Sequence, residues 1–154
     1  MLSILEPQCM LSAMKQEMPS YTTQEEVMFF DTDIGGVVHN LAYLRMIETC
    51  RTKLATEELG MDLKKMSDQG MFPVVLKTEV EYLAPATLGH KLTIKGWLEE
   101  VDKVRFWCAF EIYAEGIKKC LITCRQSLAM VQVSKDGPAR PQRLPQDWRT
   151  QWGK

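Results

Sequence analysis

Two acidic residues, Asp31 and Asp33, lie at a bend in the sequence and are the strongest candidates for chemistry. They follow the apolar end of a predicted strand, residues 27–30, and precede Gly35, Gly36 and an amphipathic helical pattern. A carboxylate at such a bend can face the N-terminus of the helix, where unpaired N–H groups carry partial positive charge. These groups can bind a developing oxyanion while the carboxylate attacks or activates water. The alternative is that the acids only shape the turn.

A helix over residues 40–59 must position the groups at this bend. Its apolar residues are spaced by four, three and four, which gives one buried stripe, and Gly60 suits the residue after its C-terminal end. A helix of this length with one apolar stripe needs a sheet or another helix to cover it. The stripe comprises Tyr43, Ile47, Cys50 and Leu54.

Alternation of apolar and polar residues predicts five strands. The short turns between the last four favour an antiparallel sheet, and apolar residues on both faces of the last strand favour a central position. The simplest architecture is of the α+β class, with a curved antiparallel sheet of about five strands wrapped around a long central helix. The strands cover residues 21–30, 72–82, 91–98, 104–112 and 118–133, with Val74, Leu76, Thr78, Val80 and Tyr82 expected on one face of the second.

Length and composition exclude several classes of protein. The 154 residues fit one domain, and a net charge of -1 from 19 basic and 20 acidic residues argues against a nucleic-acid partner. The five cysteines are odd in number and lack zinc-site spacing, which favours buried thiols in a reducing compartment. We find no metal or nucleotide motif, no secretory signal and no apolar run long enough for a membrane span, so a cytoplasmic protein is expected.

The chain divides into three parts by pattern. Residues 1–20 read as an N-terminal extension, either a short helix or a loose arm that packs on a partner subunit. Residues 21–133 carry the helix and strands of the domain. Residues 134–154 contain three prolines and read as an irregular surface tail, in which Trp148 and Trp152 are spaced for a single helical turn.

One stretch resembles a known family. The run Asp-Thr-Asp-Ile-Gly-Gly-Val-Val from Asp31, followed two residues later by Leu-Ala-Tyr-Leu, resembles the D-x-D-x-x-G-x-V signature of the 4-hydroxybenzoyl-CoA thioesterase family. The match covers residues 29–51, and the strand pattern extends it to about residue 133. The resemblance implies the hotdog fold, in which a sheet wraps around a central helix, and hydrolysis of acyl-CoA thioesters, here placed in fatty acid metabolism.

The resemblance also implies catalytic roles. It makes Asp33 the nucleophile or the general base for water, and Asp31 a residue that orders the turn or pairs with a nearby base. It places the oxyanion donor seven residues after Asp33, at the backbone N–H of Asn40 near the start of the helix. Residues alone do not separate the nucleophilic from the general-base route.

Four further residues are candidates for substrate binding. His39 either contacts substrate or lies beside the helix N-cap, and it stands one residue before the place where some family members carry His. Tyr43 either lines the acyl pocket or packs in the core. Lys103 and Arg105, at a hairpin, are candidates for the phosphates of coenzyme A, against the alternative of ordinary solvated charges.

The expected function is therefore hydrolysis of an acyl-CoA or acyl-carrier-protein thioester without a cofactor. A single thin sheet leaves an edge and a face exposed, so a homodimer or homotetramer is expected, with the active site where chains meet. Two alternatives remain: a non-catalytic acyl-ligand-binding module on the same scaffold, and a hotdog dehydratase or hydratase, which needs a His and acid pair.

Overall fold

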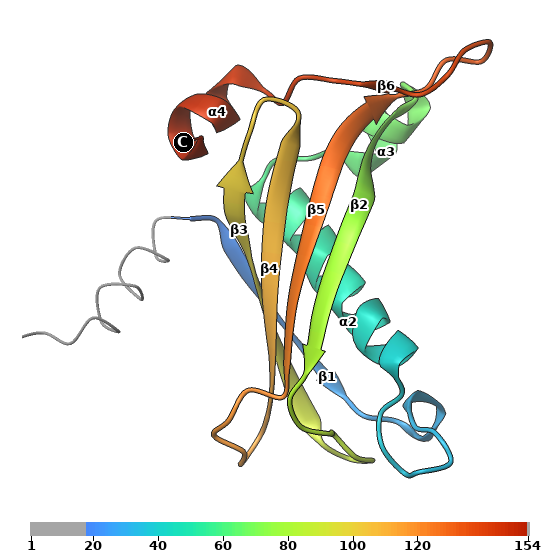
Figure 1. Cartoon of the computed structure of the whole chain (residues 1–154), viewed down its shortest axis with the longest axis vertical. Helices are drawn as coiled ribbons and strands as arrows, with labels where there is room; N and C mark the ends of the chain where they lie inside the picture. The colour runs from blue at the N-terminus through green and yellow to red at the C-terminus, as the bar shows by residue number, and fades with distance from the viewer. Residues whose placement is uncertain (1–17, 154) are drawn as a thin grey trace, which may run out of the picture.

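The computed structural model describes residues 18–153, which form a curled antiparallel sheet around one long helix (Figure 1). The strand order is β1-β3-β4-β5-β2, with a short β6 paired to β5, and every pairing is antiparallel. The central position predicted for the last long strand is confirmed, because β5 lies between β4 and β2. Most of the predicted N-terminal extension lies outside the described residues. The strands are β1 (Ser20–Glu26), β2 (Met71–Tyr82), β3 (Lys91–Val101), β4 (Arg105–Ala114), β5 (Ile122–Gln132) and β6 (Arg140–Pro141).

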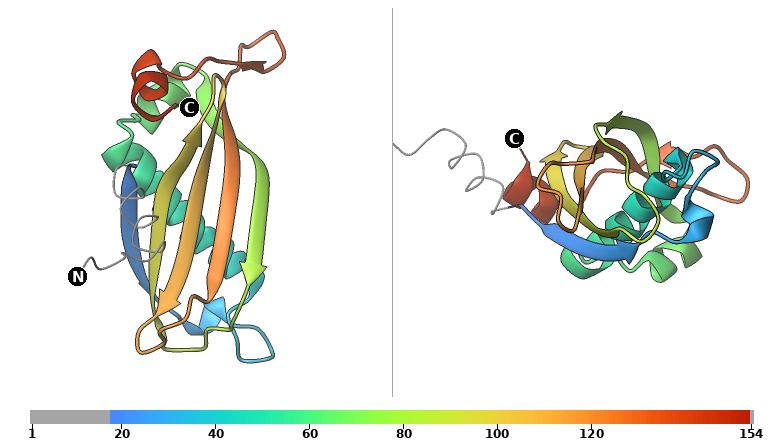
Figure 2. Two further views of the ribbon diagram at one scale, coloured as in Figure 1. Left: turned by 60° about the vertical axis from the view of Figure 1, so that its left-hand side comes forward. Right: turned by 90° about the horizontal axis from the view of Figure 1, so that it is seen from below.

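The long helix is α2 (Asn40–Lys53), which continues into the π-helical turn η2 (Leu54–Glu58). All four residues of the predicted apolar stripe are buried, and Gly60 has a φ of +66° after the helix, as expected for a glycine at this place. Viewed from the end, the sheet curls around α2 (Figure 2). Helix α2 packs closely against β1 and β3 and less closely against β2. The predicted hotdog architecture is thus confirmed.

Most residues of the C-terminal segment are exposed, but two of them pack on the core. Leu144 and Trp148 are buried, and the Trp148 ring meets Phe106 edge to face at 5.6 Å between centroids. The helical turn predicted from the tryptophan spacing is present as α4 (Gln146–Trp152). The prolines of this segment gave a correct indication of irregular backbone but no information on its burial.

The first strand ends earlier than predicted. Strand β1 stops at Glu26, and η1 (Phe29–Asp31) forms a 3-10 turn in which Phe29 and Phe30 are exposed. The amide of Asp31 donates to the carbonyl of Met28, and the Asp31 carboxylate accepts from the amide of Met28. These local bonds close the turn and end the ladder, so the apolar run does not continue as a strand.

Strand β2 contains a bulge that the alternation did not reveal. Val75 pairs with Leu128 and Lys77 pairs with Ser127, so Leu76 is the extra residue. Residues opposite each other in antiparallel strands point to the same face, so Val75 shares the face of buried Leu128, whereas Val74 shares the opposite face with Ala129. Thr78 pairs with Gln126, which is on the same face as Leu128, so the prediction that Val74 shares a face with Thr78 is wrong. The short helix α3 (Leu63–Asp68) precedes this strand.

Candidate active site

The acidic loop between η1 and α2 is a small hairpin. The Asp33 amide donates to the Val37 carbonyl at 2.9 Å, and Gly36, with a φ of +74°, donates to the Asp33 carbonyl at 2.9 Å. One step closer to the helix, the His39 amide donates to the Asp31 carbonyl at 2.9 Å. Asp33 therefore lies two residues farther along the hairpin than Asp31, roughly 7 Å from the place where the chain enters α2.

Asp33 is exposed at the tip of this hairpin. Its Oδ1 accepts from the Gly35 amide at 2.8 Å, and Oδ2 has no partner among the described residues. Among the described residues no hydrogen bond joins this carboxylate to Asn40. One carboxylate oxygen of Asp33 is thus held by its own turn and the other is available.

Asp31 is the buried acid of the pair, only 3% exposed. Its Oδ2 accepts from the Met28 amide at 3.0 Å, and its Oδ1 lies 3.8 Å from Nη2 of Arg45. Arg45 is itself held by Glu25 at 2.6 Å, and this hydrogen bond raises the pKa of the guanidinium. Asp31 has protein partners on both oxygens, which suits a residue that orders the turn.

His39 is the N-cap of α2. Its Nδ1 accepts from the Ala42 amide at 3.2 Å, so the neutral ring carries its proton on Nε2. The amide of Asn40, the first residue of the helix, donates to no group in the part of the chain that the structure describes. The helix start therefore presents a free N–H with the direction and partial charge of a helix N-terminus.

A cavity of about 290 Å³ lies beside the hairpin, between the start of α2 and the end of β2. Val37, Tyr43 and Tyr82 line it. Tyr43 is buried, its hydroxyl accepts from the Ala86 amide at 2.9 Å, and burial raises its pKa. Tyr43 is thus both a core residue and part of the cavity wall.

Lys103 and Arg105 lie far from this site within one chain. They flank the β3–β4 turn, whereas the hairpin adjoins the other end of β3, where Lys91 pairs with Glu26 of β1 (Figure 1). Both side chains are exposed. Their role in phosphate binding stays a prediction.

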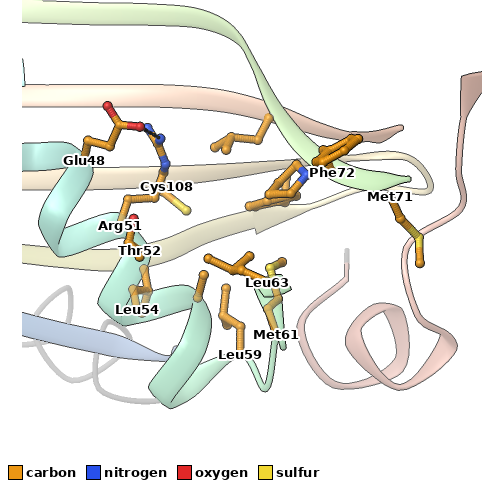
Figure 3. A pocket seen from close by; sticks show the side chains of 14 residues that line it. Glu48, Arg51, Thr52, Leu54, Leu59, Met61, Leu63, Met71, Phe72 and Cys108 are labelled. Carbon is orange, nitrogen blue, oxygen red and sulfur yellow. Dashed lines mark hydrogen bonds and ion pairs between the residues drawn. The ribbon is translucent and has the colours of Figure 1, made fainter. Parts of the chain in front are cut away.

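A second cavity, of about 260 Å³, lies between the C-terminal half of α2, α3 and the start of β2 (Figure 3). Arg51 lies at this cavity: its Nη1 donates to Oε1 of Gln126 at 2.6 Å, and its Nη2 lies 3.3 Å from Glu48. Arg51 thus pairs with Glu48, three residues before it on the helix, and with buried Gln126, a partnership that was not predicted from the sequence. A glutamine on the inward face of an otherwise apolar strand was the signal.

The comparisons with known proteins agree on one family. A model described as the thioesterase-like superfamily matches residues 27–151. A 1,4-dihydroxy-2-naphthoyl-CoA hydrolase from Synechocystis sp. is 31% identical over 140 residues, covering 86% of this chain and 94% of that protein. The acyl-CoA thioester hydrolase YbgC from Escherichia coli is 38% identical over 69 residues, covering 45% of this chain and 51% of that protein.

Solved structures share the fold. A probable thioesterase from Bartonella henselae is 26% identical with a TM-score of 0.70, covering 82% of this chain and 99% of that chain. A DHNA-CoA thioesterase from Staphylococcus aureus is 24% identical with a TM-score of 0.74, covering 85% and 87%.

Fold and relatives together define a thioester hydrolase, the predicted enzyme class. The chain belongs to the thioesterase-like superfamily, and the resemblance to the 4-hydroxybenzoyl-CoA thioesterase family is confirmed. Within residues 18–153, no helix is long and apolar enough to cross a membrane.

Proposed function

We propose that this protein hydrolyses an acyl-CoA or acyl-carrier-protein thioester, with Asp33 as nucleophile or general base and the Asn40 amide as oxyanion donor. The observation that carries the proposal is the hairpin itself, which holds an exposed carboxylate and a free helix N-terminal amide at the same end of the molecule. A thioester carbonyl bound at the Asn40 amide gains stabilisation as its oxygen becomes negative. The cavity beside Tyr43 gives the substrate an apolar wall.

The site needs a second copy of the chain. Asp33 and the Asn40 amide do not meet within one chain, and exposed apolar side chains surround them. Strand β2 is an edge strand, paired only with β5, and free edges favour pairing with another chain. These features support a homodimer with the active site at its interface; pairing of two dimers through the sheet faces would give a tetramer. The exposed apolar residues are Phe29, Phe30, Ile34, Leu41, Leu83 and Leu88.

The reducing, cytoplasmic setting rests on the cysteines. All four described cysteines are free, and three of them, Cys50, Cys108 and Cys124, are buried. Buried free thiols of this kind are common in proteins of reducing compartments.

Neither alternative activity has comparable support. A dehydratase needs a His and acid pair, but Nδ1 of His39 accepts from Ala42 and Nδ1 of His90 accepts from Thr87. Among the described residues neither ring contacts a carboxylate. A binding module without activity has no use for a free carboxylate oxygen and a free helix amide at the same end of the molecule.

The test is a panel of acyl-CoA and acyl-carrier-protein thioesters with a free-thiol readout, run on the wild type, Asp33→Asn and Asp33→Ala. We expect turnover of at least one thioester and a loss of about 100-fold or more in kcat in both variants. Asp31→Asn is the matched acid control at the same bend. Full turnover in both Asp33 variants removes Asp33 from the mechanism, and tight binding without any turnover favours the binding module.

The two chemical routes differ in where the water oxygen goes. In the nucleophilic route the Asp33 carboxylate attacks the carbonyl carbon, the C–S bond breaks, the thiolate leaves, and water then opens the anhydride. In the general-base route Asp33 removes a proton from the water that attacks directly. Single turnover in water labelled with oxygen-18 places label in Asp33 only if the anhydride forms and water attacks its aspartyl carbonyl.

A further inference from the structure

The second cavity combines an apolar wall with one cationic side chain. Leu54, Met61, Leu63 and Phe72 are among the apolar residues that line it, and Figure 3 shows Arg51 entering from α2 beside Glu48. At about 260 Å³ the cavity is larger than an apolar cavity of about 150 Å³ that binds benzene. It therefore has room for an organic group.

A chain of hydrogen bonds holds Arg51 in place, and some N–H donors of its guanidinium have no partner among the described residues. Its side chain is 17% exposed. Gln126, which accepts from Nη1 of Arg51, is buried and donates from Nε2 to Oγ1 of Thr78 at 3.3 Å. A guanidinium has five N–H donors, and among the described residues only two of them, one each to Gln126 and Glu48, have partners.

The backbone next to this group departs twice from regular geometry. The bulge at Leu76 in β2 lies beside Thr78 and opposite the segment of β5 that carries Gln126. The π-helical turn Leu54–Glu58 contributes Leu54 and Ala55 to the cavity wall. Bulges and π-turns are often found next to functional sites, and here both border one cavity.

The cavity lies within reach of the proposed catalytic end. Both cavities lie between α2 and β2: one near Tyr43 and Tyr82, the other near Leu54 and Pro73. This is the side on which α2 packs less closely on the sheet. Helical side chains point back toward the N-terminus, so the guanidinium lies near Glu48, about 12 Å along the axis from Asn40.

We propose that this cavity takes the distal end of the acyl group, and that Arg51 selects acyl groups bearing a neutral oxygen there, a hydroxyl or a keto group, over plain hydrocarbons. The inference rests on the proposed thioesterase function. The free N–H groups of Arg51 donate to the oxygen, and the Glu48 carboxylate accepts from a hydroxyl. Glu48 already balances the charge of Arg51. An acyl group that ends in a carboxylate is therefore repelled by Glu48 and gains less binding free energy from Arg51.

The test compares matched pairs of acyl-CoAs that differ only in a terminal hydroxyl, such as decanoyl-CoA and 10-hydroxydecanoyl-CoA. The acyl chains form a series of lengths around the length needed to span from the catalytic end to Arg51, on the order of ten carbon–carbon bonds. A site built to hydrogen-bond a substrate oxygen rejects the analogue that lacks it, so we expect the wild type to favour one hydroxylated member by about tenfold or more in kcat/KM. In Arg51→Met this preference disappears, so that the ratio of kcat/KM within each pair falls to about one. Arg125→Met, on the outer face of the sheet, is the matched control that keeps the preference.

Binding of non-hydrolysable acyl-CoA thioethers, measured by calorimetry, separates this inference from the proposed function. If no thioester is hydrolysed but the hydroxylated thioether binds more tightly in an Arg51-dependent way, only the proposed function fails. If Arg51→Met lowers kcat/KM for both members of a pair equally, or the wild type binds both thioethers equally, Arg51 has only a structural role and the inference is overturned. Gln126→Met, which removes the acceptor that orients Arg51, gives a second test if Arg51→Met does not fold.

Discussion

The backbone amide of His39 donates to the carbonyl of Asp31 at 2.9 Å, so the N-cap of α2 is tied directly to the buried acid of the preceding turn. This bond uses the backbone carbonyl of Asp31, while the Asp31 side chain closes the preceding turn by accepting from the Met28 amide. The two acids of the motif therefore differ in their surroundings: Asp31 is buried and holds the loop, whereas Asp33 is exposed, as its proposed role in the reaction requires.

Asp31→Ala is expected to lower stability. The substitution leaves the Met28 amide without its acceptor and removes the charge that faces Arg45, and we expect a loss of about 1–3 kcal/mol in the free energy of unfolding. Urea denaturation measures it. Asp33→Ala removes only an exposed bond to Gly35 and should change stability by less than about 0.5 kcal/mol. The reverse order of these two values would contradict the division of roles.

The helix and strands could be predicted from the sequence because their patterns of apolar residues repeat at fixed intervals. The apolar stripe of α2 and the alternation in β3 and β4 follow from periods of 3.6 and 2. Leu76 could not be predicted, because a bulge adds one residue without changing the alternation that precedes and follows it. The burial of Trp148 depends on a ring contact with Phe106, which lies far away in the sequence.

In the candidate site, too, only the features that are local in the sequence could be predicted. The motif placed Asp33 and Asn40 on the correct local elements, since a turn and a helix start are local in sequence. The hydrogen bond between Arg51 and Gln126 joins residues 75 positions apart, and no local pattern encodes it. The distance of Lys103 from the hairpin likewise follows only from the strand order.

Leu41→Asp is expected to convert the proposed dimer to a monomer. Leu41 is 66% exposed in one chain, on the first turn of α2 beside the exposed hairpin. An acid at this place suits the helix dipole, so the fold is retained, while a charge in an apolar interface is costly. Light scattering after size-exclusion chromatography measures the mass. Val133→Asp, an exposed apolar residue beyond β5, is the control that stays dimeric, and a dimeric Leu41→Asp protein would show that the interface lies elsewhere.

The buried thiols are expected to make stability fall at alkaline pH. Burial raises the pKa of Cys108 and of Cys124 to about 12, whereas an unfolded cysteine titrates near about 8.5. Above about pH 8.5 the unfolded chain therefore loses protons that the folded chain keeps, and each thiol contributes a decrease of about 1.4 kcal/mol per pH unit until its folded pKa is reached.

Denaturation at several pH values measures this slope in the wild type and in a Cys108→Ala, Cys124→Ala double variant. The double variant is less stable at pH 7 because it leaves cavities, but its stability should fall less steeply with pH. Equal slopes in the two proteins would show that other groups govern the alkaline transition. The same thiols should resist alkylation by iodoacetamide until the protein unfolds, since the thiolate is the reactive form.

Asn40→Pro removes the proposed oxyanion donor without removing the helix. Proline has no N–H, is favoured at the first helical position, and requires an extended residue before it; His39 meets this condition with φ −76° and ψ 155°. We expect kcat to fall by about 100-fold or more with little change in KM or melting temperature. Asn40→Ala keeps the amide and removes only the side chain, so it should retain most of the activity. If both variants lose activity equally, the side chain of Asn40 and not its backbone acts in the reaction, and if neither does, the oxyanion is bound by another group.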